Sequence, residues 1–142
     1  MDLRLRQTLL NLVILGIACH SVALGVAMLS LPMWTLKVVG WTYSGEIFWP
    51  SQSGLFLIIL GIAYGTAVSF RPLVWLIVGS KGSALVFLLA HALWLDAPPL
   101  VYLLGACDGA MGLLVLVLYL HVRAVEQAAG SSHCSGPGAR AR

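Results

Sequence analysis

Three ionisable side chains lie deep inside otherwise apolar stretches of this chain, and they have the clearest potential for chemistry. They are His20, Lys81 and Asp108. A charge at the centre of a bilayer costs at least about 2.5 kcal/mol even on permissive insertion scales, so such side chains normally face the protein interior and pair. We therefore predict a buried polar cluster of these three residues, in which Lys81 and Asp108 pair because their charges are opposite.

Such a cluster could serve three purposes. A Lys81–Asp108 pair could simply fix the register of two helices, and His20 could donate no more than a hydrogen bond to a neighbouring helix. The three side chains could instead bond or protonate the oxygens of a quinone, or relay protons in a transporter, which a narrow bundle would require to be an oligomer. Lys81 could also extend its ammonium towards the cytoplasmic surface and leave Asp108 without it.

The sequence carries no recognised catalytic or metal-binding motif around these residues. The doublets Cys19-His20 and Cys107-Asp108 lie at similar depth. Neighbouring residues of a helix point about 100° apart, so each doublet offers a shared centre one good ligand at most, and we expect no metal site. The cysteines have no CxxC spacing, which predicts free thiols. The lack of such a motif favours a protein without catalytic activity but leaves open whether it is an enzyme.

The composition indicates that lipid is the main solvent of this chain. Of its 142 residues, 60% are hydrophobic and only 9% are charged, with a mean hydropathy of +0.96. A soluble domain carries about a quarter charged residues, because it needs a solvated surface. The net charge of +3 is small and falls at loops and tails, so the chain has no basic face for nucleic acid.

Four apolar runs are long enough to cross a bilayer. A helix rises about 1.5 Å per residue, so about 20 residues span a hydrocarbon core of about 30 Å. The expected spans are residues 9–31, 51–70, 73–95 and 99–121, with prolines between them. The first run is too long for a cleaved signal peptide. We predict an all-α fold, a four-transmembrane-helix bundle over residues 1–123, followed by a disordered cytoplasmic tail over residues 124–142 that is rich in Gly, Ser and Ala.

The arginines predict that both termini lie in the cytoplasm. Basic residues near helix ends collect on the cytoplasmic side of a membrane. An N-in, C-in arrangement leaves only Lys37 outside and places six arginines inside, namely Arg4, Arg6, Arg71, Arg123, Arg140 and Arg142.

Aromatic residues crowd the expected outer loop between the first two spans. Indole rings favour the headgroup level, where an apolar body and a polar N–H are both accommodated. The loop could lie in the interface and cap the bundle, or it could form an aromatic lid over a lipid-like ligand. In the second case the residues lining the ligand would be Trp34, Trp41, Trp49 and Tyr64.

Small residues mark the helix faces that we expect to pack. Asp108 shares a side with Gly105 and Gly112, and the second span contains Gly61 and Gly65 at GxxxG spacing. Small residues let neighbouring backbones approach closely. His20 shares a side with Gly16, Ala23 and Ala27, so we predict that it also points into the bundle.

Several short motifs resemble those of the DoxX-like group of small bacterial four-helix membrane proteins. They are Phe48-Trp49-Pro50 leading into Leu60-Gly61-Ile62-Ala63-Tyr64-Gly65, the Arg71-Pro72 turn, Gly79-Ser80-Lys81 and Asp108. The resemblance covers roughly residues 9–121. It implies a bacterial inner-membrane location and, for some members of the group, a membrane subunit linked to quinone-dependent sulfur oxidation.

These observations favour a multi-pass membrane protein that acts as an accessory or scaffold subunit or binds a lipid-like ligand. The alternatives are a quinone-linked redox accessory subunit, with quinone as cofactor, and an oligomeric transporter of protons or small solutes. The expected partners are the lipid bilayer and a membrane protein partner or a second copy of the chain.

Overall fold

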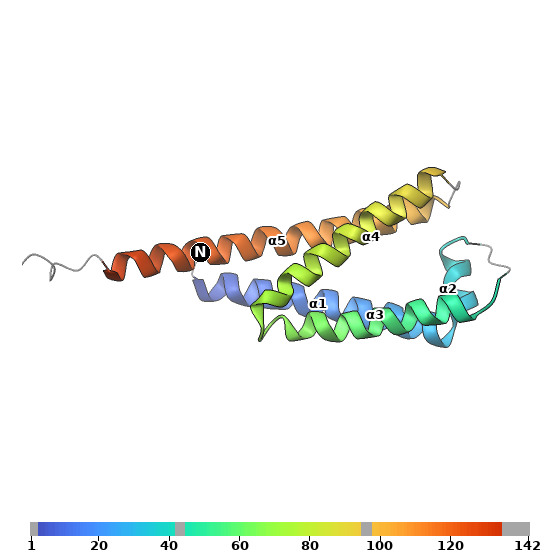
Figure 1. The fold of residues 1–142 in the computed structure, drawn as a ribbon, viewed down its shortest axis with the longest axis horizontal. Coiled ribbons are helices and arrows are strands. Elements are labelled where there is room, and N and C mark those ends of the chain that lie inside the picture. Colours follow the sequence, from blue (N-terminus) through green and yellow to red (C-terminus); the bar gives the residue numbers. More distant parts are fainter. Residues whose placement is uncertain (1–2, 42–44, 95–97, 135–142) are drawn as a thin grey trace, which may run out of the picture.

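The computed structural model describes residues 3–41, 45–94 and 98–134, and this part of the chain consists of helices joined by short turns, without strands. The elements, shown in Figure 1, are α1 (Leu3–Ser30), α2 (Pro32–Val38), α3 (Phe48–Thr66), the short 3₁₀ helix η1 (Arg71–Leu73), α4 (Val74–Trp94) and α5 (Pro99–Cys134). The predicted all-α four-helix bundle is confirmed.

Four of these helices are long and apolar enough to cross a membrane, within residues 3–30, 48–66, 71–94 and 99–128. Their outer faces are apolar as well: Ile62 is 62% exposed and Val86 is 68% exposed. Contiguous apolar surface on this scale is unfavourable in water and is what lipid solvates. The chain is therefore a multi-pass membrane protein.

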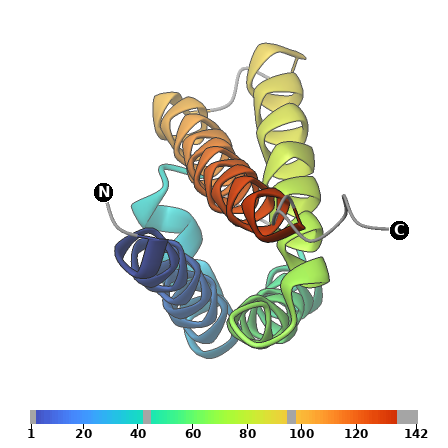
Figure 2. The same cartoon turned by 90° about the vertical axis from the view of Figure 1, so that its left-hand side faces the viewer.

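The bundle consists of two helix pairs, α1 with α3 and α4 with α5, which Figure 2 shows end-on. Glycines set the spacing in the first pair. A Cβ on Gly25 would lie 2.7 Å from the carbonyl oxygen of Gly54, and one on Gly61 would lie 2.9 Å from that of Ala18. The predicted close approach at Gly61 is confirmed, whereas Gly65 has only the Ala18 Cβ nearby, at 4.0 Å.

Glycines also line the second pair. Gly105, Gly109 and Gly112 of α5 all face side chains of α4. The glycine face of Asp108 is therefore a packing face, as the sequence predicts.

The two pairs meet closely at one end of the bundle and diverge towards the other (Figure 1). The buried core lies at the closed end, where η1 joins α3 to α4. It is formed by Leu10, Ile14, Ile17, Ala18, Tyr64, Ala67, Val74, Ile77, Val115, Tyr119 and Val122. At the open end lies α2, beside α1 and α3.

The element boundaries differ from the predicted spans at several points. α1 begins at Leu3 instead of residue 9, and Pro32, which was expected only to end the first helix, is the first residue of α2. Proline suits a first helical turn because the N–H it lacks has no partner there. α3 begins at Phe48, so Trp49 belongs to a helix and not to the loop.

The expectation of a disordered segment from residue 124 is wrong for residues 124–134, which continue α5. The stretch from Ala124 to Ala129 consists largely of good helix formers, and Gln7 donates a hydrogen bond of 2.9 Å to Glu126. That bond ties α5 to α1 at the closed end of the bundle. Residues 135–142 lie outside the described residues.

The basic residues are sorted between the two ends of the bundle. Arg71 and Arg123 line one pocket at the closed end, and Arg4 is in the first turn of α1 at the same end. Lys37 is in α2, at the open end. The N-in, C-in orientation stays a prediction, and this sorting is the charge distribution on which it depends.

Candidate functional site

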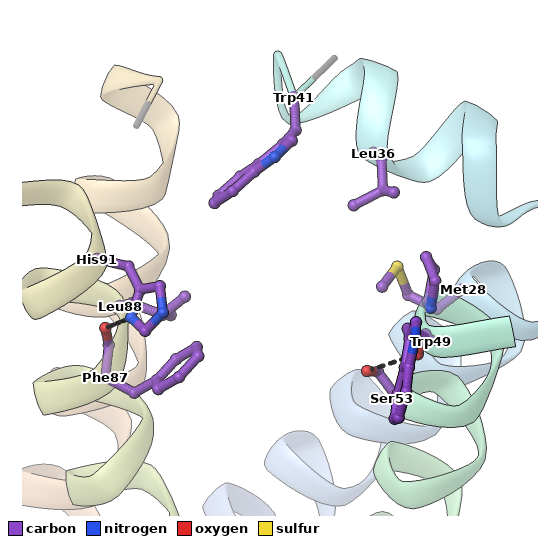
Figure 3. Close-up of a pocket in the computed structure, with 9 residues that line it drawn as sticks. Met28, Leu36, Trp41, Trp49, Ser53, Phe87, Leu88 and His91 are labelled. Carbon is purple, nitrogen blue, oxygen red and sulfur yellow. Dashed lines mark hydrogen bonds between the residues drawn. The ribbon is translucent and has the colours of Figure 1, made fainter. Parts of the chain in front are cut away.

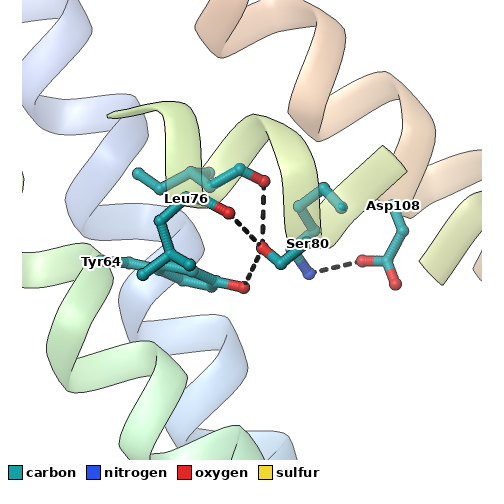
Figure 4. A network of polar contacts seen from close by, with 6 residues as sticks. Tyr64, Leu76, Ser80 and Asp108 are labelled. Atoms are coloured by element: carbon teal, nitrogen blue, oxygen red, sulfur yellow. Dashed lines mark hydrogen bonds and ion pairs between the residues drawn. The ribbon is translucent and has the colours of Figure 1, made fainter. Parts of the chain in front are cut away.

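The predicted ion pair between α4 and α5 is present. Lys81 Nζ lies 2.5 Å from Asp108 Oδ1, and the side chains are 7% and 20% exposed. The contact joins the two helices of the second pair, as Figure 4 shows. Because Lys81 is held by Asp108, its ammonium does not extend to the surface.

A second polar contact lies beside the ion pair and crosses between the two helix pairs. The Tyr64 hydroxyl of α3 is 2.6 Å from Ser80 Oγ of α4 (Figure 4). Ser80 Oγ also lies 2.7 Å from the carbonyl oxygen of Leu76, which can only accept. Ser80 has a single hydroxyl proton, so with that proton on Leu76 the hydrogen bond between the hydroxyls is donated by Tyr64.

His20 is not part of this cluster. Its side chain is exposed, as is that of Cys19, and it makes no hydrogen bond within the described residues. The prediction that His20 points into the bundle is wrong. The small-residue face that it shares with Gly16 does not pack, since a Cβ on Gly16 would meet nothing within 4 Å. α1 uses its Ala18–Gly25 face against α3 instead.

A cleft opens between the two helix pairs at the end of the bundle where α2 lies. Its volume is about 380 Å³, and we call it the aromatic cleft. The walls come from α1, α2, α3 and α4 together with Trp41, as Figure 3 shows. They are formed by Met28, Leu36, Trp41, Trp49, Pro50, Ser53, Phe87, Leu88 and His91.

Gly40 directs Trp41 back over the cleft. Its φ of 84° is in the left-handed region, which glycine adopts without strain. Trp41 N donates to Leu36 O at 2.9 Å and Gly40 N donates to Lys37 O at 3.0 Å, the paired hydrogen bonds of a Schellman motif that ends α2. The reversal places Trp41 and Leu36 on the same wall of the cleft (Figure 3).

His91 supplies the main polar atom of the cleft. Its ring lies against that of Phe87, with the centroids 3.9 Å apart, and its Nδ1 lies 2.9 Å from the Phe87 carbonyl oxygen. A carbonyl only accepts, so in the neutral imidazole Nδ1 carries the proton and Nε2 offers a lone pair. The other polar side chain, Ser53, donates its proton to Trp49 O at 3.0 Å.

Two of the four aromatics predicted to line a ligand do lie in the cleft, Trp41 and Trp49. Trp34 is 59% exposed and lies outside it, and Tyr64 is buried in the core with Ser80. Phe87 and His91 also line the cleft and are not among the site residues predicted from the sequence. Their spacing of four on one helix, which places both on one face, was the available signal.

The described residues offer no metal centre, since no three of their His, Cys, Asp or Glu side chains gather in one place. Cys19 and Cys107 are exposed free cysteines, as the sequence predicts, and the side chain of Cys134 lies outside the described part.

Comparisons of the chain with protein-family models, with curated proteins and with solved structures give no match.

Proposed function

We propose that this membrane protein binds a lipid-like molecule in the aromatic cleft, with a small polar head that carries a hydroxyl or carbonyl group. The observation that carries the proposal is the lining of the cleft. Three aromatic rings and several aliphatic side chains surround a single imidazole with an unused ring nitrogen. Apolar pockets of about 300–1,000 Å³ with a few well-placed polar groups are typical ligand sites.

The position of the cleft favours a ligand that arrives from the lipid. Trp49 of α3 is 62% exposed and Phe87 of α4 is 58% exposed, so the walls reach the outer surface of the bundle between these helices. In a membrane that surface faces acyl chains. A molecule dissolved in the bilayer therefore has a lateral path into the cleft.

The polar atoms available to the ligand define its head group. His91 Nε2 accepts a hydrogen bond in the neutral ring, which suits a hydroxyl. The indole N–H groups of Trp41 and Trp49 make no hydrogen bond within the described residues, and each can donate to a carbonyl oxygen. The hydroxyl groups of a quinol would donate to His91, and the carbonyl groups of its quinone would accept from the indoles. The DoxX-like resemblance makes this pair of molecules the first ligands to test.

The ion pair has a structural role in this proposal. Lys81 is two turns below Leu88 on α4, about 10 Å along the helix axis from the cleft wall. Its ammonium is engaged by Asp108, and His20 faces away from both. This arrangement gives less support to a proton relay through the three residues than to a binding protein.

Tryptophan fluorescence tests the proposal on protein purified in mild detergent. The probes are a short-chain benzoquinol, which has hydroxyl groups, and a dibrominated acyl lipid, which reports on chains close to an indole. We expect saturable quenching by the quinol. Trp41→Ala should weaken its binding about tenfold or more, because it removes a large apolar wall. His91→Phe keeps a ring but loses the acceptor, and should weaken the quinol more than the lipid.

Trp34→Ala is the matched control, since it removes an indole from the same region but outside the cleft. Equal weakening by Trp34→Ala and Trp41→Ala would mean that the probes partition into the aromatic surface without a site. Quenching that does not saturate would also reject the cleft and favour a scaffold role. If quenching saturates and depends on Trp41, mass spectrometry of the lipids that copurify with the protein identifies the natural occupant.

A further inference from the structure

A second pocket lies at the closed end of the bundle and is lined by two arginines that form no ion pair within the described part of the chain. It has a volume of about 250 Å³. Arg71 from η1 and Arg123 from α5 form its rim with Tyr119 and Glu126, and Leu10 and Val122 form its apolar floor. We call it the arginine pocket. It lies at the opposite end of the bundle from the aromatic cleft, shares no lining residue with it, and is independent of the proposed function.

Neither guanidinium group forms an ion pair with a described residue. Arg71 Nη1 is buried and makes no hydrogen bond, and within residues 3–41, 45–94 and 98–134 its side chain has no ion pair. Arg123 lies over the Tyr119 ring, with its Cζ 5.5 Å from the centroid, and its side chain makes no ion pair with any residue that the structure describes. Guanidinium groups that line a pocket without a carboxylate bound to them favour an anion there, because the contact is charge-assisted.

The pocket lies at the level expected for lipid headgroups. Tyr119 is near the end of the uncharged run of α5 and Arg123 is the first charged residue after it, and Arg71 lies in the turn between two membrane helices. Tyrosine and arginine are both favoured at this level of a bilayer. Basic pockets between helices at the cytoplasmic surface bind the headgroups of anionic lipids.

We propose that the arginine pocket binds a phosphate group, from an anionic phospholipid or from free phosphate. Guanidinium forks match phosphate oxygens with paired, charge-assisted hydrogen bonds. Phosphate would bridge η1 to α5, two elements that each bring one arginine to the pocket. Leu10 and Val122 would contact the first carbons of a lipid.

Glu126 works against the anion and provides an independent test. Its carboxylate lies on the pocket rim and accepts a hydrogen bond of 2.9 Å from Gln7. Glu126→Gln removes the negative charge and keeps an oxygen for Gln7. This change should tighten phosphate binding severalfold, whereas a merely structural role for the pocket gives no reason for a gain.

The experiment measures binding to the full-length protein in neutral detergent by native mass spectrometry and by thermal shift. The probes are short-chain phosphatidylglycerol, phosphatidylcholine and inorganic phosphate, at constant ionic strength. We expect preference for phosphatidylglycerol over phosphatidylcholine. Arg71→Gln and Arg123→Gln should each weaken it about tenfold, the loss expected for one charge-assisted contact. Inorganic phosphate with the same dependence on both arginines would support the pocket and identify free phosphate as a sufficient ligand.

Arg4→Gln is the matched control, because Arg4 is an exposed arginine at the same end of the bundle that does not line the pocket. Equal weakening by Arg4→Gln would show attraction to general surface charge and overturn the proposal. So would binding that is indifferent to both pocket arginines. If Arg71→Gln fails to fold, Arg123→Gln decides the question, since the Arg123 side chain is exposed.

Discussion

Gly112 gives Lys81 the room to reach its partner. A Cβ on Gly112 would lie 3.1 Å from the Lys81 Cβ, and Gly112 is one turn beyond Asp108 on α5. The close approach of α4 and α5 at this point brings the ammonium within 2.5 Å of the carboxylate. Glycine spacing and charge pairing are therefore parts of one contact, which joins the second helix pair.

Lys81→Met and Asp108→Leu should each destabilise the protein, and the double variant should lose less than the sum. Removing one partner of a buried pair costs about 3–5 kcal/mol, because the other charge is left unpaired. Thermal unfolding in mild detergent measures the coupling. Additive effects, within about 0.5 kcal/mol, would mean that the contact carries no energy. His20→Leu, at an exposed side chain, is the control and should change the unfolding temperature little.

Tyr64→Phe should lower the free energy of unfolding by about 0.5–1.5 kcal/mol, the usual net worth of one hydrogen bond. The Tyr64 hydroxyl joins α3 to α4 through Ser80, whereas most other contacts of these helices lie within their own pairs. Urea or thermal unfolding of the purified protein checks this. Ser83→Ala, one turn from Ser80 at an exposed position, is the comparison and should have a smaller effect.

Gly54→Ala should separate α1 from α3 and destabilise the bundle by about 1–3 kcal/mol, the cost of overpacking. A Cβ there would lie 2.6 Å from the carbonyl oxygen of Gly25 and 2.6 Å from the backbone nitrogen of Leu29, and neither can move without the helix. Gly79→Ala is the matched control in a helix, because a Cβ at Gly79 meets nothing within 4 Å. Equal unfolding temperatures for the two variants would contradict the close approach of α1 and α3.

Sidedness can be tested with cysteines placed at the two ends of the bundle. Lys37→Cys should react with a membrane-impermeant maleimide in intact cells, whereas Arg4→Cys should react only after the membrane is opened, because arginines favour the cytoplasmic side. A reporter fused after Arg142 that is active only outside the cytoplasm should stay inactive. The opposite labelling pattern would reverse the orientation of the whole bundle.

The membrane class and the four helices follow from the sequence alone, and the sequence also predicts the Lys81–Asp108 pair without excluding that Lys81 reaches the surface. The helices depend on local composition, and the pair depends on the large free-energy cost of an unpaired charge in lipid. Apolar runs of this length have one stable form in lipid, since every backbone group must be bonded within the segment. Two opposite charges at similar depth on consecutive helices have few other partners.

Three features depend on the packing of the helices: the direction of His20, the set of aromatic residues in the cleft, and the shared pocket of Arg71 and Arg123. His20 and Asp108 both lie on small-residue faces, and a helix with several such faces does not reveal which one packs. The cleft exists because the two helix pairs meet at one end and diverge at the other, a property of crossing geometry and not of any single segment. Residues from five segments line it, and their proximity follows from the packing of Gly25 on Gly54 and of α4 on α5.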